Sequence, residues 1–269
     1  MDRFFYPGDV LSAERIRASL RHKELTVQVY KTITSTNTVL KGLAAEGAPA
    51  GLVLVAEEQT AGRGRMGRSF YSPAGCGLYM SLLLRPALRA AQATRLTACA
   101  AVAAAETIEE LSGREAQIKW VNDIYLDERK VCGILTEASV DGERGIMRYV
   151  VIGLGVNTRV PSGDFPEELR GIAGAAFGQQ AVPELRSRLA AGILDRLTDY
   201  ASDPNDPAIF DAYRRRSFLL GREIHILAPG QEPRRSVAVG LNEDYSLLVR
   251  LPDGSTRSLA SGEVSVRTP

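Results

Sequence analysis

The sequence predicts an α+β protein in two parts, with helices and strands mixed over residues 1–216 and a small β-barrel over residues 217–269. Two observations carry this prediction. Before residue 217, apolar residues recur with both helical and strand periods. After it, short apolar runs alternate with turn-forming clusters at even spacing, which is typical of a small barrel. The chain has 269 residues, 45% of them hydrophobic, so a sizeable core can form.

The elements of the first part follow in order from the N-terminus. Residues 13–22 are expected to form a short helix, and alternating apolar residues predict a strand over residues 25–31. Residues 34–37 read Thr-Ser-Thr-Asn, and their side chains can cap a helix that runs to residue 46. A strand at 52–57, a loop at 59–73 and a strand at 77–84 come next.

Residues 90–111 carry the clearest helical pattern in the chain. Apolar side chains recur at steps of three and four residues and include several alanines, which indicates close packing onto a sheet. The remaining predicted elements of this part are strands at 118–121, 124–126, 131–140 and 147–156, and helices at 183–200 and 207–216. The predicted strands of the small barrel lie at 225–227, 237–241, 247–251 and 264–266, with hairpin signals at 242–244 and 252–254.

The composition narrows the class of protein. There are 33 basic and 32 acidic residues, so the chain lacks the broad positive excess that a general nucleic-acid binder needs. Three cysteines and two distant histidines argue against a zinc cluster and against a disulfide-built secreted domain. No apolar signal segment or membrane span is recognisable, and we expect a cytoplasmic protein.

The first segment that indicates chemistry is residues 62–68, Gly-Arg-Gly-Arg-Met-Gly-Arg. Glycine lets a backbone approach a ligand closely, and guanidinium groups bind phosphate and carboxylate. Because the arginines repel one another and glycines lose much entropy on ordering, the loop is expected to be mobile until an anion binds. A solvated basic loop, even one that contacts RNA, fits the composition equally well.

Three further segments are informative but not decisive alone. Residues 119–125, Lys-Trp-Val-Asn-Asp-Ile-Tyr, close on Arg129 and Lys130, and both Lys119 and Lys130 can reach a phosphate; a charged hairpin with a core tryptophan is the plainer interpretation. Residues 153–157, Gly-Leu-Gly-Val-Asn, end an apolar strand, where two glycines indicate a ligand, a bulge or close packing. The third segment is the Ser-Thr-Asn run at 35–37, which can cap a helix and also face a ligand.

Taken together, these segments resemble the biotin protein ligase family in order, spacing and wording. The matching motifs are residues 34–37, Gln59 with 61–65, 119–123, 129–137 (Arg-Lys-Val-Cys-Gly-Ile-Leu-Thr-Glu) and 153–157. The resemblance implies an α+β catalytic domain around a mixed sheet, followed by an SH3-like domain. Some members carry a preceding DNA-binding winged helix, but residues 1–24 are too few for it, so repressor activity is not expected.

The resemblance also implies site residues. Positions that match the biotin site are Ser35, Thr36, Asn37, Gln59, Arg63, Gly64, Arg65, Lys130, Gly133 and Gly153. Positions assigned to the nucleotide are Arg65, Arg68, Phe70, Lys119, Asn122 and Asn157. Three residues depart from the family pattern: Met66 replaces an arginine of some members, Phe70 a common tryptophan near the adenine, and Val121 a common proline.

The implied reaction joins biotin to ATP and then to a lysine of a biotin carboxyl carrier domain. Lys130 and Arg65 are expected to offset the repulsion between the biotin carboxylate and the α-phosphate, with Mg²⁺ held mainly by the phosphates. Asp123 is a candidate base for the acceptor lysine. The enzyme is expected to be a monomer or homodimer.

Two other functions stay open at this stage. Lipoate ligases and octanoyltransferases share this kind of domain, and Lys130 with Cys132 could mimic a Lys–Cys acyl-transfer pair, although Cys132 reads better as a core residue. An RNA-binding module is the remote alternative.

Overall fold

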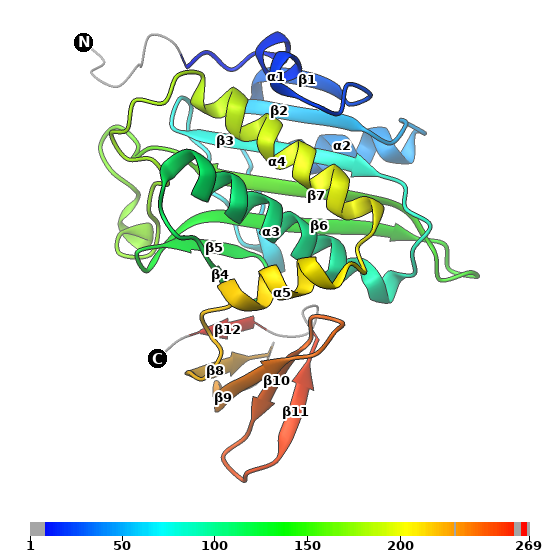
Figure 1. The fold of residues 1–269 in the computed structure, drawn as a ribbon, viewed down its shortest axis with the longest axis vertical. Helices are drawn as coiled ribbons and strands as arrows, with labels where there is room; N and C mark the ends of the chain where they lie inside the picture. The colour runs from blue at the N-terminus through cyan, green and yellow to red at the C-terminus, as the bar shows by residue number, and fades with distance from the viewer. Residues whose placement is uncertain (1–8, 229, 261–264, 268–269) are drawn as a thin grey trace.

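The computed structural model describes residues 9–228, 230–260 and, for the backbone alone, 265–267. A seven-stranded sheet forms its centre, in the order β1-β2-β3-β7-β6-β5-β4 (Figure 1). Its strands are β1 Thr26–Ile33, β2 Leu52–Gln59, β3 Gly77–Leu84, β4 Gln117–Lys119, β5 Asp123–Leu126, β6 Arg129–Val140 and β7 Met147–Asn157. Since β1 and β2 are parallel and the other neighbours antiparallel, the mixed sheet is confirmed.

Helices cover both faces of this sheet. They are α1 Ala13–Ser19, α2 Thr36–Ala45, α3 Ala93–Ser112, α4 Leu185–Ser202 and α5 Pro207–Arg216. In Figure 1, α3 and α4 cross the near face of the sheet, and α2 lies behind it. The alanine stripe of α3 is fully buried in the larger core cluster, as the sequence predicted, while α2 packs in a separate cluster with Leu54 and Val151.

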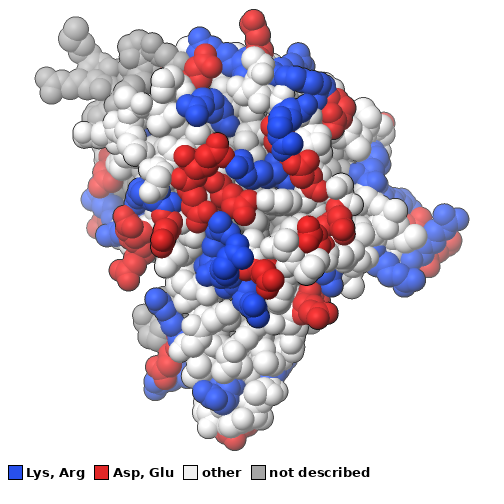
Figure 2. All heavy atoms as spheres, in the orientation of Figure 1, with Lys and Arg blue, Asp and Glu red and all other residues white. Residues whose placement is uncertain are grey.

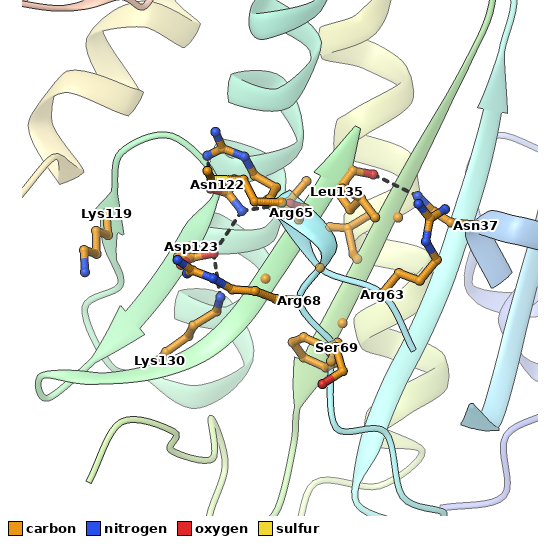
Figure 3. Close-up of a pocket in the computed structure, with 18 of the residues that line it drawn as sticks. Asn37, Arg63, Arg65, Arg68, Ser69, Lys119, Asn122, Asp123, Lys130 and Leu135 are labelled. Carbon is orange, nitrogen blue, oxygen red and sulfur yellow. Dashed lines mark hydrogen bonds and ion pairs between the residues drawn. The ribbon is translucent and has the colours of Figure 1, made fainter. Parts of the chain in front are cut away.

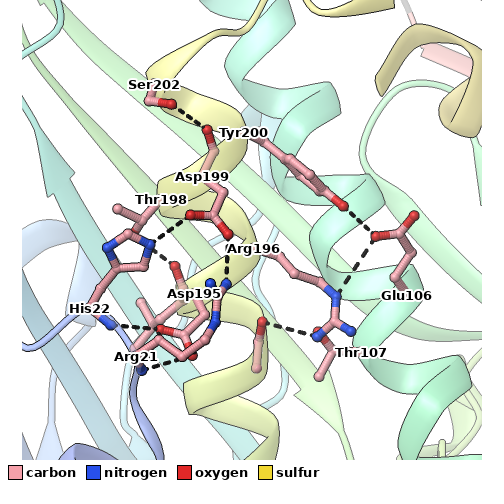
Figure 4. Close-up of polar contacts among 12 residues, drawn as sticks. Arg21, His22, Glu106, Thr107, Asp195, Arg196, Thr198, Asp199, Tyr200 and Ser202 are labelled. Atoms are coloured by element: carbon pink, nitrogen blue, oxygen red, sulfur yellow. Dashed lines mark hydrogen bonds and ion pairs between the residues drawn. The ribbon is translucent and has the colours of Figure 1, made fainter. Parts of the chain in front are cut away.

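The N-terminal segment is attached to α4 by side chains far away in the sequence. Asp195 of α4 accepts hydrogen bonds from the backbone N–H groups of Arg21 and His22, at 2.9 and 3.1 Å. Asp199, one turn further along, binds the side chains of both residues (Figure 4). These contacts take the place of the last turn predicted for the first helix, which ends at Ser19 rather than at residue 22.

The C-terminal part is a five-stranded antiparallel sheet, in the order β11-β10-β9-β8-β12. Its strands are β8 Glu223–Leu227, β9 Arg234–Leu241, β10 Leu247–Arg250, β11 Thr256–Leu259 and β12 Ser265–Arg267. Strand β11 was not predicted, because its Thr, Arg and Ser side chains are exposed and show no apolar alternation. The predicted division at residue 216 falls in the connection between α5 and β8.

The surface over α3, α4 and α5 carries charges of both signs, closely interspersed (Figure 2). Several of them are paired: Arg216 binds Glu109 at 2.6 Å, and Arg196 binds Glu110 at 2.5 Å. This view therefore shows no broad basic area. Among the described residues, no helix combines the length and apolarity that crossing a membrane requires.

Candidate active site

One cavity of about 560 Å³ lies between the start of α2, the loop at 62–70 and the strands β4 to β7, within the usual size of a ligand pocket. It brings together nearly all the side chains and glycines that the sequence predicted for the site. The predicted residues that line it are Ser35, Thr36, Asn37, Gln59, Arg63, Gly64, Arg65, Arg68, Phe70, Lys119, Asn122, Asp123, Lys130, Gly133 and Gly153. Asn157, at the end of β7, is not among its lining residues, so its role stays a prediction.

One end of the cavity is a network of neutral hydrogen-bonding groups. Gln59 Oε1 accepts from the backbone N–H of Thr36 at 2.9 Å and lies 3.2 Å from its hydroxyl. Gln59 Nε2 donates to Ser72 Oγ at 2.9 Å, and Ser81 Oγ lies 2.7 Å from Thr36 Oγ1. Ser35 caps α2, as predicted. Because these groups hold one another, their orientation is fixed before any ligand arrives.

Asn37 is the central residue of this network. Its Oδ1 accepts from Ser81 Oγ at 2.6 Å, and its Nδ2 donates to Leu135 O and Glu137 Oε2, each at 3.1 Å. Ser81 and Leu135 are the two cross-strand neighbours of Gly153. The amide of Asn37 therefore spans three strands and lies directly over Gly153.

This arrangement decides between the interpretations left open for the glycines of β7. A β-carbon at Gly153 would lie 2.0 Å from Asn37 Oδ1, and one at Gly155 would lie 2.5 Å from Phe70 Cε1. A β-carbon at Gly133, the cross-strand neighbour of Gly155, would meet Lys130 Nζ and Phe70 Cε2, each at 3.2 Å. These glycines let side chains of the site lie flat on the sheet. Phe70 thus packs on the cavity floor beside Lys130.

Glu137 is a residue that sequence reasoning did not assign to the site. It accepts from Asn37, from Lys41 Nζ at 2.6 Å and from Arg63 Nη1 at 3.0 and 3.1 Å. Although burial opposes ionisation, the hydrogen bonds from Lys41 and Asn37 and the charge of Arg63 hold the pKa of Glu137 below its usual value. Glu137 is not among the lining residues of the cavity. It connects three elements around the cavity: α2, β6 and the loop at 62–70, which we call the arginine loop.

The other end of the cavity is cationic (Figure 3). Lys130 Nζ lies 2.7 Å from Asp123 Oδ1, and Asn122 Nδ2 donates to the same oxygen at 3.0 Å. Arg65 Nη1 donates to Asn122 Oδ1 at 2.9 Å. Burial lowers the pKa of the Arg65 guanidinium, and the charge of Asp123 opposes this shift. Cationic side chains that line this end are Arg65, Arg68, Lys119 and Lys130.

The arginine loop is a compact hairpin in this structure. Gly64 N donates to Arg68 O at 2.7 Å, Phe70 N donates to Gly62 O at 2.9 Å, and Arg63 bridges to Ser69. A β-carbon at Gly62 would lie 2.3 Å from Phe70 O, so this hairpin requires glycine there. The expected change from mobile to ordered on anion binding stays a prediction.

The turn at Trp120–Asp123 differs from the predicted strand over 118–121, because β4 ends at Lys119. The peptide bond between Trp120 and Val121 is cis, at the position where the family pattern commonly has proline. Asn122 connects the turn to β6. Its side-chain Nδ2 donates to Ile134 O at 2.8 Å, and its backbone carbonyl accepts from Ile134 N at 2.9 Å.

Among the described residues, no cluster of three or more histidine, cysteine or acidic side chains could hold a metal ion. Asp123 and Glu128 line the cavity, and Asp123 is already paired with Lys130. Mg²⁺ on the phosphates of a nucleotide would therefore need most of its ligands from those phosphates and from water.

In comparisons with known proteins, both parts of the chain match models of biotin protein ligase domains. The model of the Biotin/lipoate A/B protein ligase family matches residues 29–157, and that of the Biotin protein ligase C terminal domain matches residues 219–267. The biotin–[acetyl-CoA-carboxylase] ligase of Paracoccus denitrificans is 32% identical over 75% of this chain and 85% of its own.

Two other relatives show the extent of the similarity. The bifunctional ligase/repressor BirA of Bacillus subtilis is 41% identical over 62% of this chain, and the chain spans about half the length of that relative (51%). The structure of a biotin protein ligase from Aquifex aeolicus in complex with biotin and ATP covers 91% of this chain and 99% of its own, with a TM-score of 0.72 and 27% identity.

Proposed function

The chain belongs to the biotin protein ligase family, and we propose that it is an ATP-dependent biotin–[acetyl-CoA-carboxylase] ligase. In this reaction biotin and ATP form biotinyl-5′-AMP and pyrophosphate. The biotin is then transferred to a lysine of a biotin carboxyl carrier domain. We place this activity in the cytoplasm.

One observation carries the proposal: the cavity has one end of hydrogen-bonding groups, where the charge of Arg63 is paired with Glu137, and one cationic end. The ureido ring of biotin is neutral and needs donors and acceptors, which suits the hydroxyl and amide side chains of Thr36, Asn37 and Gln59 that line this end. The biotin carboxylate and the phosphates are anionic, which suits Arg65, Arg68 and Lys130. Such a site rejects ligands that leave its buried polar groups without partners.

The cationic end also explains how the first step can occur. The carboxylate must approach the α-phosphate although both are negative, so charge has to be offset where they meet. Lys130 supplies an ammonium held by Asp123, and Arg65 supplies a guanidinium held by Asn122. Mg²⁺ on the phosphates would neutralise further charge when bound.

In the second step the acceptor lysine must attack as a free amine, although its unperturbed pKa is about 10.4. Asp123 Oδ1 lies in the cavity and remains our candidate base. Its contact with Lys130 gives it a second role, since it holds the lysine that neutralises the leaving phosphate.

The direct test is exchange of labelled pyrophosphate into ATP with biotin, lipoate or octanoate as the carboxylic acid, followed by transfer to a purified carrier domain. We expect exchange with biotin and labelling of one carrier lysine. Exchange with lipoate alone would identify a lipoate ligase, and no exchange with any acid would refute adenylation.

The acyltransferase alternative requires a reactive thiol at Cys132. Cys132 is fully buried in the hydrophobic core, and burial raises the pKa of its thiol to about 12, so the thiolate nucleophile is scarce at neutral pH. We predict that Cys132→Ala keeps at least half of the biotin transfer rate of the parent, measured on the carrier domain. Loss of transfer, with a thioester trapped in the parent, would favour the acyltransferase.

Arg65 is expected to retain the reactive adenylate. The Arg65 side chain reaches across the cavity to Asn122, so the loop can cover an intermediate and exclude water. We predict that Arg65→Gly releases biotinyl-AMP and labels lysines of a bystander protein such as serum albumin, detected by mass spectrometry. Labelling confined to the carrier lysine would show that Arg65 contributes to binding alone. Cleavage within residues 62–68, with and without biotin plus ATP, tests ligand-dependent ordering of the same loop.

Glu137 is expected to act on biotin binding without touching biotin. Glu137→Gln removes the charge that anchors Arg63 and Lys41 and keeps the size of the side chain. We predict about tenfold weaker binding of biotin by calorimetry, since each charge-assisted hydrogen bond contributes about 1.5–3 kcal/mol. Lys41→Met is the matched control, because it removes one partner of Glu137 and leaves Arg63 and Asn37 in place; wild-type affinity in Glu137→Gln would contradict this role.

A further inference from the structure

The turn between β9 and β10, residues 242–246, is a hydrogen-bonded hairpin turn at one end of the C-terminal sheet. Asn242 N donates to Ser246 O at 3.0 Å, and Tyr245 N donates to Asn242 O at 2.8 Å. Asp244 Oδ1 accepts from the backbone and the hydroxyl of Ser246. Tyr245 has a φ of 64° and is only 1% exposed. A strained, fully buried tyrosine at the tip of a polar turn indicates that this tip is docked on something.

The tip of this turn packs on the first part of the chain, at Trp120 and at α5. Trp120 comes directly before the residues that hold the cationic end of the cavity. The backbone carbonyl of Tyr245 accepts from Trp120 Nε1 at 2.8 Å, in a buried hydrogen bond. The ring of Tyr245 packs edge-to-face on Phe210 and Tyr213 of α5, with centroids 5.4 and 5.2 Å apart. The hydroxyl of Tyr213 in turn donates to Val121 O at 3.1 Å.

The far side of the same turn holds the cations of the site. Asn122 accepts from Arg65 at 2.9 Å, and Asp123 pairs with Lys130 at 2.7 Å. Four consecutive residues, 120–123, therefore lie between the hairpin of the C-terminal sheet and two groups assigned to adenylation. The biotin end is held differently, by contacts among α2, β2, β3 and β6.

We infer that Tyr245 is a positioning residue for adenylation, and that the C-terminal sheet holds the turn at 120–123 so that Arg65 and Lys130 meet the phosphates. This inference rests on the proposed function. Its physical basis is that a displacement of about 1 Å in a positioning group can cost about 10²-fold in rate. It predicts an asymmetry: damage to the hairpin lowers turnover with ATP strongly and changes the affinity for biotin much less, because the groups expected to hold the ureido ring lie at the other end of the cavity.

The test compares two substitutions in the C-terminal sheet of the full-length chain. Tyr245→Leu removes the ring that packs on α5 and keeps a residue with a side chain at the positive φ. Leu259→Ala, on β11, removes a buried side chain of the same sheet and is the control for lost stability. The measurements are biotin-dependent pyrophosphate exchange at varied ATP, calorimetric affinity for biotin, and Tm.

For Tyr245→Leu we expect kcat/KM for ATP to fall about tenfold, with the Kd for biotin within twofold of the parent. Leu259→Ala should leave both within twofold, whatever its Tm. Wild-type kcat/KM in a folded Tyr245→Leu protein, or equal losses in the two variants, would overturn the inference. If the parent itself shows no exchange with biotin, it is the proposed function that fails.

Two smaller substitutions, Tyr213→Phe and Tyr245→Phe, test the same role by removing a hydroxyl and keeping the ring. Tyr213→Phe deletes only the hydroxyl bound to Val121 and should lower kcat/KM for ATP about threefold without weakening biotin. Tyr245→Phe keeps the ring and should have the same kcat/KM for ATP as the parent. Trp120 is the one tryptophan of the chain, so its emission reports on the turn. A red shift in Tyr245→Leu that is absent in Leu259→Ala is expected, and wild-type rates in Tyr213→Phe with an unshifted Tyr245→Leu would refute the role.

Discussion

Replacing Lys130 with alanine is expected to lower biotin-dependent pyrophosphate exchange by about 10²–10³-fold while Tm stays close to that of the parent. Lys130 Nζ lies over Gly133, beside Phe70, where the neutral and cationic ends of the cavity meet. Its removal takes away a positive charge at the point where two anions must react. It also leaves Asp123, now without its partner at 2.7 Å, to repel the phosphates.

The control for Lys130→Ala is a second lysine of the same cavity. Lys119 also lines it, with its ammonium 5.7 Å from the centre of the Tyr125 ring. Lys119→Ala removes the same charge from a neighbouring place and should cost about tenfold or less. Near-wild-type exchange in Lys130→Ala would contradict this role for Lys130, and equal losses in the two variants would show that only the summed charge of the cavity matters. The double variant Lys130→Ala/Asp123→Asn should recover part of the loss if repulsion by Asp123 contributes.

Most of the fold could be predicted from the sequence because most elements carry a local signal. The alanine stripe of α3 and the apolar alternation of β1 identify their elements directly, and their bounds differ by two to three residues at most. Strand β11 carries no such signal, because it is held by backbone pairing with β10 and its side chains face solvent. Residues 120 and 121 of the turn were assigned to the end of a strand, because apolar Trp120 and Val121 are buried without being in the sheet.

The residues of the site also fall into two groups, those that a sequence motif identifies and those that only the folded chain brings into place. Residues in motifs, such as Lys130 and Asn37, carry chemistry that a sequence displays, and the cavity brings them together. Ser81 could not be found from sequence, since a lone serine in a strand has no local sign of its partners. Glu137 ends the motif at 129–137, but nothing in that motif shows that its carboxylate binds Asn37. Their role arises from pairing among β3, β7 and β6, which places residues more than 40 apart in sequence around one amide. Tyr245 could not be found from sequence either, because its partner Trp120 lies far away along the chain.

Gly153 is where that three-strand arrangement is least tolerant of change. Its two neighbours in the sheet, Ser81 and Leu135, both bond Asn37, so the amide is fixed above the glycine from either side. An added β-carbon would lie 2.0 Å from Asn37 Oδ1 and 2.7 Å from its Cγ. Since neither the sheet nor the amide can move without breaking hydrogen bonds, Gly153→Ala must displace Asn37 from the ligand site.

We therefore predict that Gly153→Ala weakens biotin binding by about 10²-fold and lowers Tm, with overpacking of this kind costing about 1–3 kcal/mol. Gly42→Ala, in the middle of α2 with nothing within 4 Å of the added carbon, is the matched control and should bind biotin normally with an equal or higher Tm. Gly155→Ala meets the Phe70 ring at 2.5 Å; because Phe70 lies on a loop, its ring can move away, and biotin affinity should fall by less than tenfold. Calorimetry with biotin on the three variants orders these effects. Equal affinities for Gly153→Ala and Gly42→Ala would mean that the amide of Asn37 does not hold the ligand, and the neutral end of the cavity would then have to be assigned to other groups.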